Sequence, residues 1–185
     1  MTANPLWDFS LDVYARPGVA EACVALQDET GLDVNLLLFC IWCAAQGPGN
    51  LTPDDLRDAL ALTGGWQAEI IGPLRGVRRR AKTMPGPPLF LGAFHRDIAA
   101  TELSAERVEQ WMLYDSVSER SEHGLQDFAV LAAACANLVT YLRAAGVEPT
   151  LQRSRLSVLL SASLPDLDHA KIGDALGRAL SGSGA

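Results

Sequence analysis

The segment from residue 34 to residue 45 places the strongest constraint on the fold, because nearly every side chain in it is apolar. Asp33 directly before it can cap a helix, and the Gly-Pro-Gly sequence at 47–49 after it breaks regular structure. A helix that is apolar on all sides belongs in the centre of a protein core. Its longest apolar run, residues 36–45, is too short for a membrane span, which needs about 20 residues. We therefore expect a buried central helix.

Helix signals recur along the rest of the chain, whereas short β-branched runs of alternating polarity, the pattern of strands, are missing. Thr52 as a cap with Pro53 in the first turn begins one helix, which the glycine pair at 64–65 is expected to end. The Gly-Pro pair at 72–73 predicts a kink or break in the next helical stretch. Further helices are expected at residues 7–14, 19–30, 66–84, 91–122, 125–145, 151–164 and 167–180.

Length and composition agree with one helical domain. The chain has 185 residues, of which 49% are hydrophobic and 20% charged, and this suits a globular domain with its own core. We predict an all-α, single-domain helical bundle of about seven to nine helices over residues 1–181. The proline-rich loop at 84–88 would join two halves, 5–84 and 89–181, and residues 182–185 would form a flexible tail.

Charge and cysteine usage restrict the compartment and the partners. With 22 acidic and 15 basic residues the net charge is -7, so any contact with nucleic acid must be local. The four cysteines lie in apolar runs without the spacing of a disulfide scaffold, which favours a reducing compartment. The first ten residues lack the pattern of a secretory signal. We expect a cytoplasmic location and no membrane partner.

One helix face carries the most distinctive charge pattern, the basic stripe formed by Arg75, Arg78, Arg79 and Lys82. These positions share one face because a helix turns by about 100° per residue. The opposite face is apolar and holds Leu74, Val77, Ala81 and Met84. Guanidinium groups match the paired oxygens of phosphates and carboxylates. The basic stripe is therefore a candidate site for a small anion, an acidic protein or a nucleic acid.

An internal layer of ion pairs is the alternative for the basic stripe. Three acidic residues share one face of the following helix, namely Glu102, Glu106 and Glu109. If the loop at 84–88 folds the two helices into an antiparallel hairpin, Arg75 comes near Glu102. In the same hairpin Arg79 comes near Asp97. We favour this alternative, because such charged faces are more often paired or solvated than bound to a ligand.

A second candidate site is the polar cluster between two apolar helices, formed by Gln27, Asp28, Asp33 and Asn35. Polar groups in apolar surroundings need hydrogen bonds, so these residues could line a small pocket or bind a cation. The interpretation we favour is that Asp33 caps a helix while the others bond the backbone of the turn. The spacing lacks the regular oxygen ligands of a calcium loop.

Cys40 and Cys43 form a C-x-x-C pattern inside the apolar segment. Burial would raise the pKa of both thiols, whereas a redox pair needs an exposed position that lowers it. We interpret the two cysteines as small core residues. The chain has no second C-x-x-C and no histidine at ligand spacing, so we expect no metal. No cofactor motif is present either.

Several stretches follow the pattern of one known family. They are W-D-F-S at 7–10, V-Y at 13–14, P-G-V at 17–19, L-Q-D at 26–28, D-V-N-L-L-L-F at 33–39, P-L-R at 73–75 with Arg78, Arg79 and Lys82, and E-L, A-E and E-Q at 102–103, 105–106 and 109–110. Over roughly residues 7–145 the chain resembles a small bacterial family, mainly proteobacterial, that is described as a domain of unknown function. The resemblance supports a helical fold and implies no activity, cofactor or catalytic residue.

Two hypotheses of function follow. No phosphate loop, dinucleotide fingerprint or nucleophile elbow occurs, so nothing gives a reason to name an enzyme. The first hypothesis is a non-enzymatic cytoplasmic adaptor or regulatory protein that binds an acidic protein or nucleic-acid partner through the basic stripe. The alternative is an enzyme or carrier that holds a small anionic ligand between helices. A basic stripe that faces solvent would favour the adaptor, whereas an inward stripe beside the polar cluster would favour the small ligand. If the arginines are fully paired with Glu102, Glu106 or Asp97, both hypotheses lose their main support.

Overall fold

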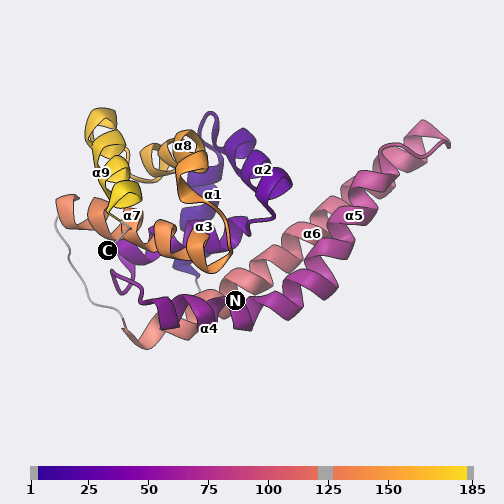
Figure 1. Ribbon diagram of the computed structural model, residues 1–185. Coiled ribbons are helices and arrows are strands. Elements are labelled where there is room, and N and C mark those ends of the chain that lie inside the picture. Colours follow the sequence, from indigo (N-terminus) through magenta and orange to yellow (C-terminus); the bar gives the residue numbers. More distant parts are fainter. Residues whose placement is uncertain (1–3, 121–126, 183–185) are drawn as a thin grey trace.

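The computed structural model describes residues 4–120 and 127–182, and within them the chain forms helices and turns and no strand. This confirms the all-α prediction. Figure 1 shows a rounded body from which a pair of helices projects. Of the tail predicted at 182–185, all but Gly182 lies outside the described residues. The same holds for the predicted helix ends at 121–122 and 125–126.

The body is built around one buried helix. Its helices are α1 (Pro5–Tyr14), α2 (Val19–Thr30), α3 (Val34–Gln46), α7 (Asp127–Ala144), α8 (Arg153–Ser163) and α9 (His169–Ser181). Helix α3 packs along α7, and its residues 36–44 are at most 4% exposed. The predicted central helix is therefore present. Cys40 and Cys43 are buried within it, and burial raises the pKa of both thiols, as expected for core cysteines.

Polar side chains fix both ends of α3. Asp33 caps its first turn, as predicted, and the hydroxyl of Tyr141 on α7 accepts the backbone N–H of Asp33 at 2.8 Å. At the other end the fully buried Asn137 donates to the backbone carbonyls of Cys40 and Gly49, each at 3.0 Å. The bond to Tyr141 satisfies a backbone N–H that the helix leaves open at its start, and the bonds of Asn137 fix α3 and the turn after it against α7.

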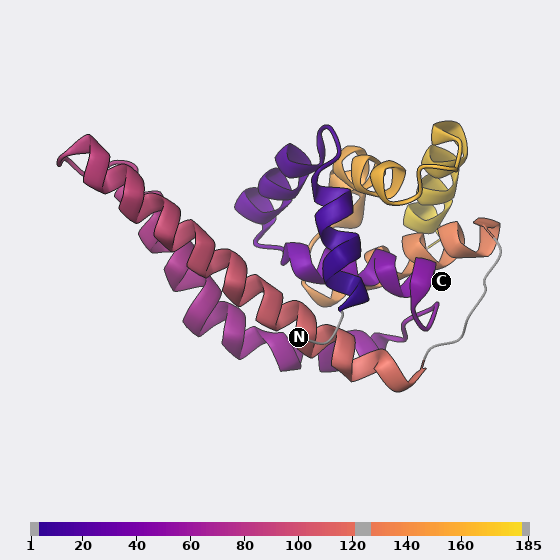
Figure 2. The same ribbon diagram turned by 180° about the vertical axis from the view of Figure 1, so that it is seen from behind.

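The projecting part, here called the arm, consists of residues 67–110. The chain runs through α4 (Pro53–Trp66), a π-helical turn (Gln67–Ile71) and α5 (Gly72–Ala81), turns at the tip, and returns as α6 (Pro88–Val117). Helices α5 and α6 pack against each other as an antiparallel pair, which is the predicted hairpin. In Figures 1 and 2 the tip stands apart from the body in both views. We call residues 79–97 the far end of the arm, and the remainder the arm root.

One predicted helix boundary is wrong, because the helix does not end at the glycine pair 64–65. Of the kink or break predicted at 72–73, the break does not occur, because the chain stays helical through both residues. Instead the π-helical turn precedes Pro73, and the N–H of Gly72 donates to the carbonyl of Gln67, five residues back. The wider turn accommodates a proline that has no N–H of its own to donate. Gly72 also leaves room for it, since a Cβ there would lie 3.0 Å from the Gln67 carbonyl oxygen.

The loop at the tip is displaced from its predicted position. It covers residues 82–87, and α6 begins at Pro88 instead of at residue 91. A proline is favourable in the first turn of a helix, where its missing N–H would have no partner in any case. The earlier start places Leu89 and Phe90 on the first turn of α6. No helix in the part of the chain that the structure describes is long and apolar enough to cross a bilayer.

Candidate functional site

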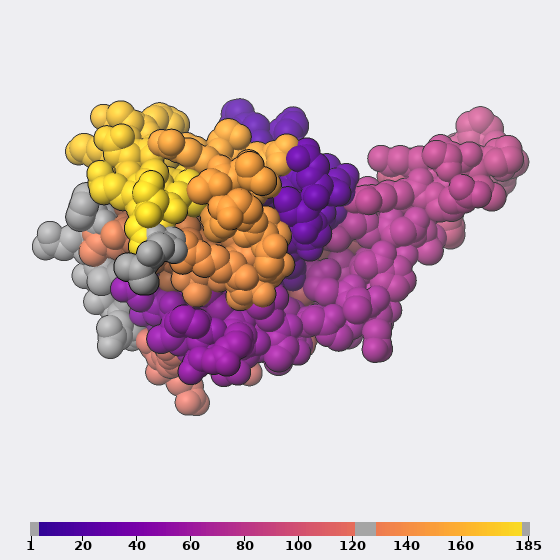
Figure 3. All heavy atoms as spheres, in the orientation of Figure 1, coloured from indigo at the N-terminus to yellow at the C-terminus, as the bar shows by residue number. Residues whose placement is uncertain are grey.

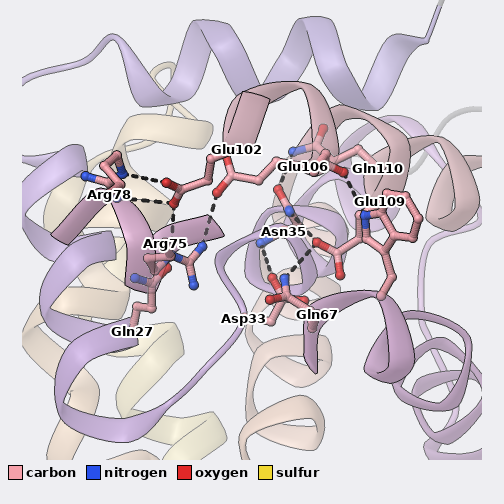
Figure 4. A network of polar contacts seen from close by, with 12 residues as sticks. Gln27, Asp33, Asn35, Gln67, Arg75, Arg78, Glu102, Glu106, Glu109 and Gln110 are labelled. Atoms are coloured by element: carbon pink, nitrogen blue, oxygen red, sulfur yellow. Dashed lines mark hydrogen bonds and ion pairs between the residues drawn. The ribbon is translucent and has the colours of Figure 1, made fainter. Parts of the chain in front are cut away.

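An ion-pair layer joins α5 to α6 at the arm root (Figure 4). Arg75 donates from Nε to Glu102 at 3.1 Å and from Nη2 to Glu106 at 3.1 Å. Arg78 contacts both carboxylate oxygens of Glu102, whose side chain is only 6% exposed. The contact of Arg75 with Glu102 is the one that the sequence spacing predicts. Two members of the basic stripe therefore belong to the interior of the hairpin.

The ion-pair layer is close to electrically neutral, and its pKa shifts reflect this. Burial alone would raise the pKa of Glu102, but the hydrogen bonds and charges of Arg78 and Arg75 lower it below its usual value. Burial raises the pKa of Glu106, and the charge of Arg75 opposes that shift only in part. Two guanidinium groups face two carboxyl groups. The layer therefore has little excess positive charge to offer a small anion.

The other two members of the basic stripe have different surroundings. Arg79 pairs with Asp28 of α2, so its predicted contact with Asp97 is wrong. Arg79 lies one helical turn from Arg75 on the side of α5 that faces the body, whereas Arg78 faces α6. Lys82 is exposed, and no ion pair with another described residue involves it. The stripe thus separates into an inner half that joins helices and an outer half at the far end.

The polar cluster is also divided. We predicted that Asn35 bonds the backbone of the turn, and this is wrong, because its side-chain amide enters the core. Its Nδ2 donates to Glu109 and its Oδ1 accepts from Gln110 Nε2 at 2.8 Å. Among the described residues, the side chain of Gln27 forms one hydrogen bond, to its neighbour Asp28 at 3.5 Å. Gln110 was not predicted as a site residue, although it belongs to the E-Q stretch of the family resemblance, because a single glutamine in a helical pattern has no distinctive spacing.

Asp33 and Glu109 form a buried carboxyl pair at the centre of this network (Figure 4). Glu109 is 0% exposed, and its Oε2 accepts from Asn35 and, at 2.8 Å, from Gln67 Nε2. Glu109 Oε1 and Asp33 Oδ2 are buried and have no other donor among the described residues. One proton shared between the two carboxyl groups gives both oxygens a partner.

The surroundings of the two carboxyl groups favour Glu109 as the one that holds the shared proton. Burial, followed by the nearby charge of Asp33, raises the pKa of Glu109 to about 9. Burial also raises the pKa of Asp33, but the backbone N–H groups of Asn35 and Leu36 bind its carboxylate. The positive end of the α3 dipole supports the same charge. A carboxylate at Asp33 and a carboxylic acid at Glu109 therefore connect α3 to the arm root.

Two cavities lie on either side of this network. The first, of about 380 Å³, brings the two candidate sites together, since Gln27, Asp28 and Asp33 border it with Arg75 and Arg79. The second, of about 330 Å³, lies between α1, α2, α3 and the arm root. Gln27 and Arg75 border both cavities. The sequence-predicted residues therefore converge, with the exception of Lys82.

The far end of the arm exposes large apolar side chains. Leu89 is 78% exposed, Phe90 72%, Phe94 47% and Met84 45%. Figure 3 shows this region as a narrow projection that no other element covers. Sequence reasoning missed these residues as a candidate surface. The signal was the L-F-L-G-A-F sequence after Pro88, which places apolar side chains on more than one side of a helix.

Residues 5–113, which include the whole arm, match the profile of a family described as "Protein of unknown function (DUF2390)". The chain belongs to this family. The match ends at Leu113 in α6, short of residue 145, to which the sequence resemblance extended. The family region therefore contains the far end of the arm and the arm residues that border the two cavities, but it does not contain α7 to α9. Comparisons with curated proteins and with solved structures give no match.

Proposed function

We propose that this chain is a non-enzymatic cytoplasmic adaptor that binds an acidic protein through the far end of its arm. The observation that supports the proposal best is the exposure of Leu89 and Phe90, at 78% and 72%, on a projecting pair of helices. Burying one such side chain in an interface contributes about 1.5–3 kcal/mol. Clustered apolar residues on a surface typically mark a contact with another molecule.

The charge of the far end supports an acidic partner. Residues 79–97 hold four basic side chains, Arg79, Arg80, Lys82 and Arg96, against one acidic side chain, Asp97. The chain as a whole has a net charge of -7, so this region has the opposite sign to the rest. Opposite charges speed association and select among partners. Leu89 and Met84 favour a protein over nucleic acid, because these exposed side chains beside the cations have no ring on which a base could stack.

This proposal differs from the sequence hypothesis in the residues involved. The charges of Arg75 and Arg78 are balanced by Glu102 and Glu106 inside the hairpin, so they offer an acidic protein no exposed positive surface. The contact surface consequently moves outward along the arm, to residues beyond Arg78. The alternative of a ligand with only negative charge held by the same arginines loses its physical basis, because Glu102 and Glu106 already balance their charge.

Site-specific crosslinking in cells tests the proposal. A photoreactive amino acid replaces Phe90 in one version of the full chain, and Leu151 in a second version. Leu151 is 76% exposed on the body, so it matches Phe90 in exposure. We expect a protein adduct from position 90 and none of the same mass from position 151. Mass spectrometry should map the adduct to an acidic segment of its partner.

Charge reversal in the crosslinking chain sharpens the result. Arg80→Glu with Lys82→Glu should reduce the adduct at position 90 at least fivefold, while Arg57→Glu on α4 should leave it unchanged. In the described part of the chain, the ion pair of Arg57 is with Asp54 on its own helix, at the surface. Adducts that consist of RNA, or only of a second copy of the chain, would contradict the proposal. So would an adduct that the charge reversal leaves intact.

A further inference from the structure

The second cavity, of about 330 Å³, has one polar wall and one apolar wall. The polar wall is the ion-pair layer of the arm root, with Arg75, Arg78, Glu102 and Glu106. The apolar wall comes mainly from α1, α2 and α3 and includes Trp7, Leu11, Val24 and Leu38. The volume of the cavity is at the lower end of the range for ligand sites, roughly 300–1,000 Å³. It suits a small molecule and not a large cofactor.

Both signs of charge on the polar wall have open hydrogen-bonding positions. Among the described residues, no hydrogen bond uses Nη1 of Arg75 or of Arg78. Oε2 of Glu106 is likewise unoccupied, since Arg75 contacts only Oε1. A guanidinium N–H can donate to a carboxylate, and Glu106 can accept from an ammonium group. The wall therefore offers partners for an anionic and a cationic group side by side.

The net charge of the wall restricts the ligand further. Two guanidinium groups and two carboxyl groups balance, so a ligand with a single charge would leave that charge partly uncompensated in a half-buried site. A molecule with one charge of each sign avoids this cost.

We propose that this cavity binds a small amphipathic zwitterion, namely a free amino acid with an apolar side chain. The carboxylate of the ligand contacts Arg75 and Arg78, and its ammonium group contacts Glu106. The side chain of the ligand lies against Trp7, Leu11 and Leu38. This site is separate from the far end of the arm, so it adds a ligand to the proposed adaptor and does not depend on the adaptor's partner.

Calorimetric titration of the full chain with four probes tests the ligand class. The probes are L-phenylalanine, its N-acetyl derivative, its amide and glycine. The first is an apolar zwitterion, the next two each keep one charge, and glycine lacks the apolar side chain. We expect L-phenylalanine, or L-leucine in its place, to bind at least tenfold more tightly than the other three. Equal affinity for the acetylated or amidated probe would overturn the zwitterion, and no binding of any probe would overturn the site.

Two variants of α6 locate the binding. Leu103 borders the cavity and is 49% exposed, so Leu103→Asp should keep the fold and weaken binding of L-phenylalanine at least tenfold. Val108 is 44% exposed on the same helix but is not among the residues that border the cavity, so Val108→Asp should bind like the unchanged protein. Equal binding by both variants would overturn the location. The crosslink at Phe90 tests the adaptor independently, because neither variant alters the far end.

Discussion

At the arm root Arg75 and Arg78 share the carboxylate of Glu102, whereas at the far end Arg80 and Lys82 are exposed and form no ion pair with the described residues. The apolar residues differ in the same way. Ile71 at the root is 0% exposed, but Leu89 at the far end is 78% exposed. One pair of helices thus contains a packed half and an open half.

The difference shows that arginines and apolar residues of one hairpin stabilise the fold at the root and are exposed at the far end. The root packs against α1, α3 and α4, so its charges and apolar groups stabilise the position of the arm. Beyond the ion pair of Arg79 with Asp28 on α2, the far end projects away from the body (Figure 1), and its exposed surface is left for a partner. We therefore expect different changes in the free energy of unfolding when an exposed cation and when a buried ion pair is disrupted.

The largest contrast is expected between Glu102 and Arg80. Glu102→Ala leaves Arg75 and Arg78 partly buried without their carboxylate, and we expect a loss of about 2–3 kcal/mol in the free energy of unfolding. Arg80→Ala removes an exposed cation, and we expect a change within about 0.5 kcal/mol. Urea denaturation followed by circular dichroism measures both. Similar losses for the two variants would show that root and far end do not differ.

The next contrast concerns pH, through the proton on Glu109. The pKa of Glu109 is raised to about 9 in the folded state, so the folded chain holds this proton at pH values where the unfolded chain has released it. Its contribution to stability is therefore largest in acid and declines as pH rises from about 5 to about 9.

Glu109→Gln should remove that pH dependence. The glutamine keeps an oxygen for Asn35 and Gln67 and supplies a permanent N–H to Asp33. Relative to the unchanged protein, the variant should gain more than about 1 kcal/mol of stability between pH 5 and pH 8.5. Arg80→Ala, measured in parallel, should show no such relative gain. Parallel stability curves for Glu109→Gln and the unchanged protein would argue against a proton on Glu109.

Much of the fold could be predicted from the sequence, because local signals determine it. Asp33 and Thr52 are side-chain caps, and each begins a helix where the sequence places it. The apolar segment 34–45 is the central helix, since no other position can satisfy twelve mainly apolar residues. The contact between Arg75 and Glu102 could also be predicted, because spacing within each helix and one short loop were sufficient.

Other features depend on contacts between segments far apart in the sequence. Arg79 binds Asp28 and not Asp97, because α2 lies beside the arm root, which no local pattern reveals. The carboxyl pair joins Asp33 to Glu109 across 76 positions of the chain. The exposure of Phe90 was missed for another reason: the apolar residues of 89–94 lie on more than one side of a helix, but an apolar residue is ordinarily expected to pack inward.

The smallest contrast separates two glycines of one helix. At the root, Gly72→Ala places a Cβ 3.0 Å from the Gln67 carbonyl oxygen, which is backbone and cannot move freely, so we expect a loss of about 1 kcal/mol. Four residues further out, a Cβ at Gly76 meets nothing within 4 Å, and Gly76→Ala should gain about 0.5–1 kcal/mol because alanine favours the helix. Thermal unfolding of both variants measures the two shifts. We expect the two variants to shift the midpoint of thermal unfolding in opposite directions, because the π-helical turn is tightly packed at the root and α5 has free space around Gly76. Shifts in the same direction would mean that the packing of α5 does not change along the arm.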